Sequence, residues 1–149
     1  MAMSKHLRAF RAGANILAFN KNDMNYGMTC AWAMMVDYSK IAMLIGGQSI
    51  TGQNLELGMS VGVSALAEGQ QEVAKVFGVN HSNEVNKFEN IKYTNKDNML
   101  LINDAKVLME CVVCDIQNFD GDLLVFLEVK DFNENEEKDF LDGYDKNNY

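Results

Sequence analysis

The sequence of 149 residues lacks the features that mark several classes of protein. It has no apolar run of the ~20 residues that a membrane-spanning helix needs. Lys5, His6, Arg8 and Arg11 interrupt the N-terminus, where a secretory signal would be continuously apolar. We therefore expect no membrane association and a cytoplasmic location. An excess of basic residues is also missing, because the net charge is −8. Such a charge argues against a nucleic-acid surface.

Histidine and cysteine, the usual ligands of zinc and other transition metals, are scarce. The chain has two histidines, His6 and His81, and three cysteines, Cys30, Cys111 and Cys114. An odd cysteine count without an export signal favours reduced thiols. Cys111 and Cys114 form a C-x-x-C motif inside an apolar, strand-like run, where positions three apart point to opposite faces. We therefore expect buried structural thiols and no metal site.

The order of elements is that of an all-β domain. The sequence has no alternation of strands with helices and no nucleotide-type G-x-G-x-x-G motif, and its length suits one domain. About seven strands are predicted, and Asp120-Gly121-Asp122 is a hairpin signal between the last two. We predict a mainly β fold, a closed antiparallel split barrel with two or three short helices at its rim. The predicted strands span residues 13–19, 29–35, 41–45, 59–66, 99–103, 105–117 and 122–129.

The last part of the chain has a different composition. From Asp131 onward acids far outnumber Lys138 and Lys146, and aliphatic residues are few. This pattern predicts a domain over residues 7–131 and an acidic, flexible tail over residues 132–149, with a short helix around Phe140 and Leu141. The polar stretch 79–98 is expected to be a loop.

The most informative stretch is Asn25-Tyr26-Gly27-Met28-Thr29-Cys30-Ala31-Trp32. Asn25 with Gly27 close behind offers a sharp turn, because both residues tolerate positive φ. The glycine lets the backbone approach a ring closely, Thr29 supplies a hydroxyl and Trp32 a flat wall. Taken alone, the pattern favours a hairpin that enters a half-buried strand. The other interpretation is a strand that lines a flat ligand.

A second candidate site follows Gly46-Gly47. Ser49 or Thr51 can cap a short helix that Gly58 would end. A helix start with two hydroxyls is also a plausible phosphate cradle. The alternative is a capped helix without a ligand. Further along, Lys87-Phe88 is a basic–aromatic pair that could reach a ligand, although a surface lysine is the more common explanation.

With these parts in order, residues 10–129 resemble the flavin reductase-like family of FMN-binding split barrels, which includes the flavoredoxins. Six motifs in the right order and spacing carry the resemblance. They are Asn25 to Trp32; Ser49-Ile50-Thr51 with Asn54; Gly62-Val63-Ser64-Ala65-Leu66 followed by Gln70, Val73, Ala74 and Phe77; Asn86-Lys87-Phe88; Met109-Glu110-Cys111; and Asp120-Gly121-Asp122 ahead of Phe126-Leu127-Glu128-Val129.

The resemblance implies a homodimer that holds FMN in a groove between subunits. It places one group of residues along the isoalloxazine ring, a second group at the phosphate or ribityl chain, and one lysine on the phosphate side. No catalytic side chain is implied, because the flavin carries the hydride chemistry. The ring residues are Met28, Thr29, Cys30, Ala31 and Trp32. The residues at the phosphate or ribityl chain are Ser49, Ile50, Thr51 and Asn54, and the lysine is Lys87.

Three departures from the family pattern stand out. Leu123 occupies the position after the last hairpin where the family often has histidine, which leaves the electron donor open. The chain has no proline, whereas the family usually has prolines in the break that here reads Asp37-Tyr38-Ser39-Lys40. Asn25-Tyr26-Gly27 is one residue longer than the family's Asn-Gly turn.

Three hypotheses about function remain open on the sequence. The leading one is a flavoprotein oxidoreductase that takes electrons from NAD(P)H, or from a redox protein partner, and passes them through FMN to a flavin, iron or a protein. The second is a non-catalytic FMN-binding electron-transfer protein. The third is a barrel whose ligand groove has decayed, against which the glycines and hydroxyls at both ends of the groove count.

Overall fold

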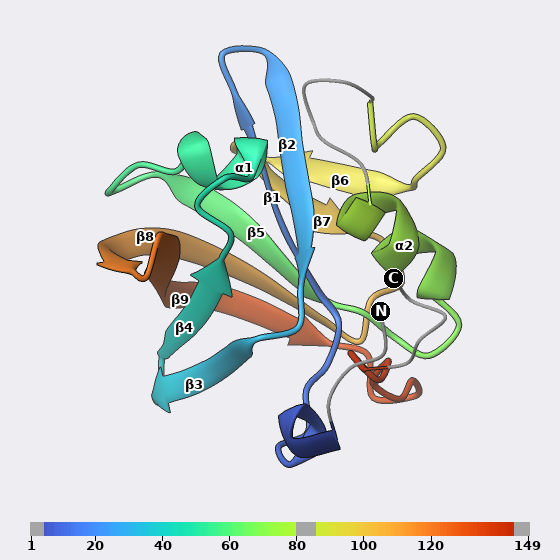
Figure 1. The fold of residues 1–149 in the computed structure, drawn as a ribbon. Coiled ribbons are helices and arrows are strands. Elements are labelled where there is room, and N and C mark those ends of the chain that lie inside the picture. Colours follow the sequence, from blue (N-terminus) through green and yellow to red (C-terminus); the bar gives the residue numbers. More distant parts are fainter. Residues whose placement is uncertain (1–4, 80–85, 145–149) are drawn as a thin grey trace.

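The computed structural model describes residues 5–79 and 86–144. Residues 80–85 of the expected loop, with His81, and residues 145–149 of the expected tail lie outside the described residues. The described chain is mainly β, with nine strands and three short helices (Figure 1). In chain order the elements are η1 (Lys5–Arg8), β1 (Asn15–Lys21), β2 (Met24–Cys30), β3 (Ala33–Asp37), β4 (Lys40–Ile45), α1 (Ile50–Gln53), β5 (Ser60–Ala65), α2 (Gln71–Val79), β6 (Tyr93–Lys96), β7 (Met99–Ile102), β8 (Val107–Phe119) and β9 (Asp122–Glu134).

All the described strands belong to one antiparallel sheet in the order β3-β4-β9-β8-β5-β1-β7-β6, and β2 pairs with β1 beside this path. The first half of β1 is therefore held between β2 and β5. The sheet is not closed, because no ladder among the described residues joins β2 to β3 or β4. The mainly β antiparallel fold is confirmed, whereas closure of the predicted barrel is not.

Strand β1 separates two apolar clusters, because successive side chains point to opposite faces. Leu17 and Phe19 belong to a cluster enclosed by β4, β5, β8 and β9. Ile16 and Ala18 belong to a second cluster, which includes side chains from α2 and β7. The nearly continuous apolar run of β1 follows from burial on both faces.

The turn between β1 and β2 lies within the polar stretch Asn20 to Asn25, where the sequence predicts a turn. Asn22 and Asp23 have positive φ values of 52° and 63°, and the ladder then pairs Asn20 with Asn25. Asn and Asp tolerate positive φ, so the turn predicted over Asn20 to Asn25 is confirmed, whereas the sharp turn suggested at Asn25 itself does not form, because Asn25 is paired within β2. Gly27 also lies within β2, opposite Ala18.

Gly27 allows α2 to pack closely on β2. A Cβ atom at Gly27 would lie 2.7 Å from Cε1 of Phe77 and 3.1 Å from Cζ of Phe88. Both rings are buried and meet edge to face, with centroids 4.9 Å apart. The glycine does admit a ring, as the sequence suggested, but the ring belongs to the protein's own core.

We expect Gly27→Ala to lower the free energy of unfolding by about 1–3 kcal/mol, because the added methyl group would push Phe77 out of its position. Urea titration monitored by circular dichroism measures this change. Gly46→Ala is the matched control, since a Cβ atom there would meet nothing within 4 Å. Equal midpoints for Gly27→Ala and the wild type would contradict the close packing.

The short helix predicted to end at Gly58 is shorter in the structure. Ser49 caps α1 as predicted, accepting a hydrogen bond from the amide of Gly52, but α1 ends at Gln53 and does not reach Gly58. The side chain of Asn54 donates to the carbonyl of Ile50 at 2.8 Å and so satisfies the helix end early. Helix α2 continues through Gly78 to Val79.

The expected acidic tail is part of the fold as far as it is described. Strand β9 continues past residue 131 to Glu134, and Leu141 is only 3% exposed. The amide of Ala14 donates to the carbonyl of Leu141, whose own amide donates to Leu66. Apolar residues spaced between the acids make this docking possible, and the charged side chains remain at the surface.

The cysteines have different surroundings. Cys30 and Cys111 are buried thiols, as predicted, whereas Cys114 is exposed. The ladder between β8 and β9 shifts register between Val113 and Asp115, and this bulge contains Cys114. All three thiols are free.

Candidate functional site

The candidate site is a groove where the sheet is open between β2 and β4. The groove has a volume of about 340 Å³ and receives four residues from the end of β2 and the link to β3. The end of β4 and the C-terminal segment supply the other walls. Its lining residues are Thr29, Cys30, Ala31, Trp32, Leu44, Gly46, Asp122, Gly143 and Tyr144.

Trp32 forms the flat wall of the groove. It lies in the link between β2 and β3, its side chain is 49% exposed, and its indole Nε1 donates to the hydroxyl of Tyr144 at 3.2 Å. The carbonyl of Trp32 accepts from the amide of Leu44, which joins this link to β4. The large apolar indole ring is thus held at the surface by the hydrogen bond from Nε1 to Tyr144.

Cys30 lines the groove as a neutral thiol. Its single S–H has two carbonyl oxygens within hydrogen-bonding distance of Sγ, those of Trp32 at 3.3 Å and Leu44 at 3.4 Å. Burial raises the pKa of Cys30 from 9.0 to about 11. At neutral pH the group is therefore not a thiolate, and its nucleophilic or redox use is disfavoured.

The hydroxyl of Thr29 is already used within the fold. Thr29 is 8% exposed, and its Oγ1 donates to the carbonyl of Ala74 in α2 at 2.7 Å. Thr29 and Gly27 share the face of β2 that meets α2, whereas Met28 faces the cluster on the other side. Thr29 can thus shape the groove and position α2 at once.

The start of α1 lies beside the same strand. The Oγ of Ser49 donates to the carbonyl of Gly46 at 2.7 Å and lies 3.7 Å from the sulfur of Met28. Ile50 is half-buried and Thr51 is 2% exposed. The structure therefore brings the predicted phosphate residues next to the predicted ring residues, and the Ser49 hydroxyl serves as the helix cap.

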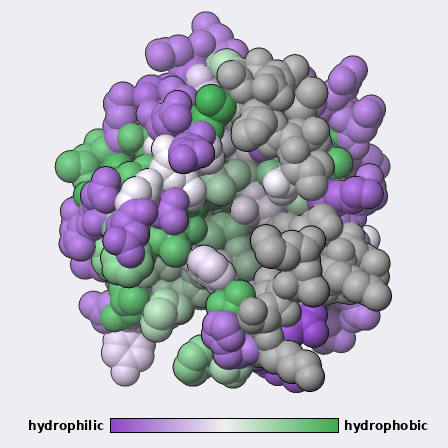
Figure 2. All heavy atoms as spheres, in the orientation of Figure 1, coloured by the Kyte–Doolittle hydropathy of each residue, from purple (hydrophilic) through white to green (hydrophobic). Residues whose placement is uncertain are grey.

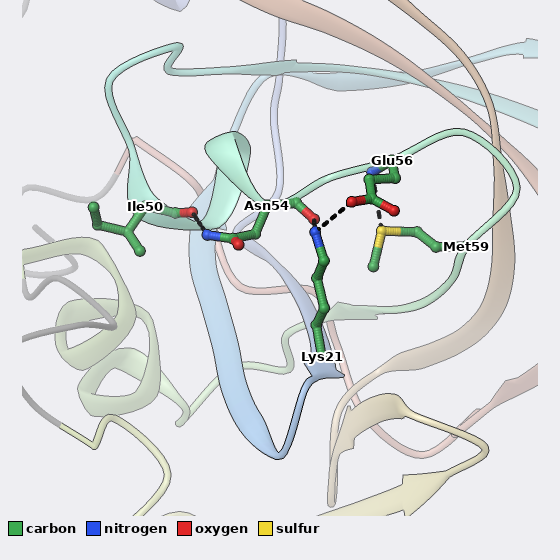
Figure 3. A network of polar contacts seen from close by, with 5 residues as sticks. All are labelled: Lys21, Ile50, Asn54, Glu56 and Met59. Carbon is green, nitrogen blue, oxygen red and sulfur yellow. Dashed lines mark hydrogen bonds and ion pairs between the residues drawn. The ribbon is translucent and has the colours of Figure 1, made fainter.

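The far end of α1 is held by a polar network (Figure 3). Lys21 Nζ donates to the carbonyl of Asn54 at 3.0 Å and to the Glu56 carboxylate at 2.7 Å. The amide of Glu56 in turn contacts the sulfur of Met59 at 3.1 Å. Asn54, predicted to touch the ligand, thus has its side-chain amide and its carbonyl engaged in fixing α1.

Lys87 lies on the α2 side of β2. It is 6% exposed, and its Nζ donates to the carbonyls of Gly27 at 2.7 Å and Phe77 at 3.1 Å. Burial lowers the pKa of Lys87 from 10.5 to about 8. The surface lysine considered from the sequence is ruled out, and Lys87 does not line the groove.

The family of the chain follows from a comparison with family models. Residues 7–148 match the model described as "Flavin reductase like domain".

The chain belongs to the flavin reductase-like family.

As a member of this family it is an oxidoreductase of the flavin reductase class. The match also runs well beyond residue 131, in line with the docking of Leu141. No curated protein sequence matches the chain.

Several solved structures share the fold. The NADH:FAD oxidoreductase SgcE6 of Streptomyces globisporus C-1027 has a TM-score of 0.81 at 18% identity, over 94% of this chain and 90% of that one. The flavoredoxin of Methanosarcina acetivorans has a TM-score of 0.75 at 13% identity, over 91% and 75%. The flavin reductase PheA2 has a TM-score of 0.72 at 19% identity, over 90% of each chain.

The groove fits a flavin ring in its chemistry. An exposed indole, small residues and few polar groups suit a flat, largely apolar ring system. The groove is open to solvent on one side, and 340 Å³ is at the low end of the volumes typical of cofactor sites. A flavin-sized ligand would therefore leave part of its surface uncovered by this chain alone.

Five of the groove residues were missed by the sequence analysis: Leu44, Gly46, Asp122, Gly143 and Tyr144. Asp122 is placed by the amide of Gly47, which donates to its carboxylate at 3.2 Å. Tyr144 was missed because the tail was expected to be flexible. The apolar spacing of Phe140, Leu141 and Tyr144 among the acids was the available signal.

An apolar patch adjoins the open side of the sheet. Edge strand β3 exposes the side chains of Met34, Met35 and Val36 by 65%, 50% and 46%, and Tyr38 follows them fully exposed. Figure 2 shows hydrophobic side chains gathered over the β3 side of the molecule. Unpaired edge strands of this kind are prone to association.

Other kinds of site were also sought. Within residues 5–79 and 86–144, no group of three or more His, Cys, Asp or Glu side chains could hold a metal ion. Neither α1 nor α2, nor any other helix in the described part of the chain, has the length and apolarity to cross a membrane.

Proposed function

We propose that the protein binds FMN in the groove at Trp32 and uses it to pass electrons from NAD(P)H to a flavin, iron or protein acceptor. The exposed indole of Trp32, held by its hydrogen bond to Tyr144 at 3.2 Å, is the observation that carries this proposal. A structure of the Streptomyces globisporus relative in complex with NAD and FAD fragments supports it, at a TM-score of 0.77 and 20% identity over 88% of this chain and 79% of that one.

The flavin would supply the hydride and electron chemistry. The chain's residues would bind and orient it. Trp32 would cover one side of the ring, Met28 and Ala31 would line its edge, and the start of α1 would lie toward its phosphate. Cys30 would remain a protonated thiol beside the ring, because burial keeps its pKa near 11.

We further propose that two copies of the chain form the complete site. The groove is open, and the apolar side chains of Met34, Met35 and Val36 lie on a neighbouring unpaired edge. A second copy that covered this edge would bury the apolar patch and exclude water from the flavin. This assembly agrees with the homodimer that the family resemblance implies.

A specific observation keeps a protein electron donor as a second candidate. Leu123 is half-buried and packs against the interior cluster. No polar group is offered at the position where family members often carry histidine. Reduction of the bound flavin by a reduced ferredoxin-type protein, but not by NADH or NADPH, would establish this version.

The first test is retention of FMN after mixing and gel filtration, read from the flavin absorption of the protein peak. We expect the wild type to retain FMN and Trp32→Ala to bind it roughly tenfold or more weakly, because aromatic stacking contributes about 1–3 kcal/mol. Phe132→Ala, which removes an aromatic side chain 67% exposed outside the groove, is the control. Light scattering on the same column measures the molar mass and so shows whether the protein is a dimer.

Loss of FMN retention in the wild type would contradict a tightly held cofactor. Equal retention by Trp32→Ala and the wild type would contradict the place of the ring. Where the wild type retains no FMN, oxidation of NADH or NADPH with added FMN would indicate transient use of flavin. No oxidation would indicate a barrel without a working groove.

A further inference from the structure

The first and last segments of the described chain meet beside the groove, which Gly143 and Tyr144 line. The amide of Gly143 donates to the carbonyl of Ala12 at 2.9 Å, and Gly13 pairs with Asp142. A Cβ atom at Gly143 would lie only 2.1 Å from the carbonyl oxygen of Gly13, so this close approach requires glycine at position 143. The backbone that carries Tyr144 is therefore fixed by the opposite end of the described chain.

Tyr144 is bonded at three of its polar groups. Its carbonyl accepts from the guanidinium of Arg8, and its amide donates to a carboxylate oxygen of Asp142 at 2.9 Å. Its hydroxyl accepts from the indole Nε1 of Trp32 at 3.2 Å. A single residue thus connects Arg8, at the end of η1, to the ring that forms the flat wall of the groove.

Arg11 offers a comparison for Arg8. The two residues are the only arginines of the chain, and both line a second cavity, of about 520 Å³, between the two segments. Both side chains are exposed. Of these two arginines, Arg8 is the one that donates a hydrogen bond to Tyr144 within the described part of the chain. The two positions therefore separate the effect of a hydrogen bond to Tyr144 from the effect of a nearby positive charge.

The orientation of the Trp32 ring depends on Tyr144, because the ring is half exposed and lies in the link between β2 and β3. The hydrogen bond from Leu44 fixes the backbone carbonyl of Trp32, whereas the bond from Nε1 to Tyr144 fixes the ring itself. An exposed side chain that is free to change rotamer loses this freedom when a ligand stacks on it, and this loss weakens binding. A ring that is already held in place avoids most of this loss.

We propose that Arg8 and Tyr144 form a clasp that holds the indole of Trp32 in position for stacking on the flavin ring. This inference rests on the proposed function for the flavin itself. Tyr144 contacts the indole directly, and Arg8 is a positioning residue that acts through Tyr144. The segment that follows η1 thereby influences how tightly the groove binds flavin, although Arg8 does not line the groove.

The fluorescence of Trp32 in the full chain without ligand tests the clasp directly, because Trp32 is the only tryptophan. We expect Tyr144→Phe and Arg8→Met to lower the fluorescence anisotropy of the indole and to increase its quenching by acrylamide, since each variant breaks one contact of the clasp. Arg8→Lys retains a donor and should restore part of the wild-type anisotropy. Arg11→Met, the matched control, removes the same charge and should leave both quantities unchanged.

Titration of the same proteins with FMN measures the consequence for binding. We expect Tyr144→Phe to weaken FMN binding roughly two- to tenfold, the range for a ligand that must immobilise one side chain. Arg8→Met should weaken FMN binding by a smaller factor in the wild-type background. In the Tyr144→Phe background Arg8→Met should have no further effect, because two residues that act through one contact are not additive.

The results also separate this inference from the proposed function. If the wild type binds FMN but Tyr144→Phe matches it in FMN affinity or in the anisotropy of Trp32, the clasp alone is overturned. Additive losses for Arg8→Met and Tyr144→Phe, or an equal loss for Arg11→Met, overturn the role of Arg8. If both clasp variants lower the anisotropy of Trp32 but the wild type binds no FMN, the clasp is supported and the flavin proposal is overturned.

Discussion

Replacing Leu141 by alanine is expected to lower the free energy of unfolding by about 2–5 kcal/mol. Leu141 is 3% exposed and packs in the cluster that also contains Ala14, Ile16 and Leu66. Truncation would remove buried apolar surface and leave a cavity that the hydrogen-bonded backbone around it could not readily fill. Chemical unfolding followed by tryptophan fluorescence measures this loss.

The matched control for Leu141→Ala is Leu57→Ala, at a leucine that is 65% exposed. This control should change stability by less than about 0.5 kcal/mol. If both variants unfold at the wild-type urea concentration, the C-terminal segment does not dock. In that case the groove would lack the wall that Tyr144 supplies.

The second large effect concerns pH and Lys87. Between pH 7.5 and 9.5 the wild type should gain about 2 kcal/mol of stability relative to Lys87→Met. Burial lowers the pKa of Lys87 from 10.5 to about 8 in the folded state. Above pH 8 the unfolded chain still binds the proton that the folded chain has lost, so unfolding takes up a proton and higher pH opposes it.

The comparison with a variant is needed because two buried thiols act in the opposite direction. Burial raises the pKa of Cys30 to about 11 and that of Cys111 to about 12, from 9.0. In this pH range the unfolded thiols lose protons first, which destabilises the folded state as pH rises. Both thiols are present in the wild type and in Lys87→Met, so their contribution cancels in the difference.

Urea titrations of the wild type and Lys87→Met at the two pH values give the measurement. Lys92→Met, at an exposed lysine of the same segment, is the control and should show a difference independent of pH. A difference for Lys87→Met that also stays constant with pH would mean that Lys87 titrates normally and is not buried as described.

Local patterns predicted much of the fold correctly. The break at Tyr38 and Ser39, the cap at Ser49 and the hairpin at Asp120-Gly121-Asp122 are each set by residues adjacent in sequence. The strand predicted over residues 29–35 was wrong, because its residues are divided between β2 and β3, and the stretch 79–98 expected to be a loop contains β6. The other predicted strands follow from runs of apolar residues. The mainly β antiparallel fold and the family could therefore be inferred from the order of these parts.

The candidate site was only partly predictable. Thr29, Cys30, Ala31 and Trp32 do line one groove, but the hydroxyl of Thr29 donates a hydrogen bond to the carbonyl of Ala74. Lys87 was expected on the phosphate side and instead donates to two backbone carbonyls. Hydrogen-bond partners 45 to 60 residues away along the chain leave no local mark on the sequence.

By itself, the sequence determined the antiparallel β architecture, the helix cap and the small-residue stretch that leads to Trp32, because these depend on neighbouring residues and on apolar alternation. Only the tertiary structure decided that the sheet stays open beside β2, that Gly27 receives Phe77, and that Leu141 docks in the core. The same packing brings Tyr144 to Trp32 and both arginines to one cavity. Such contacts form between distant segments, and their free energy comes from burial and hydrogen bonds that exist only once the chain has folded.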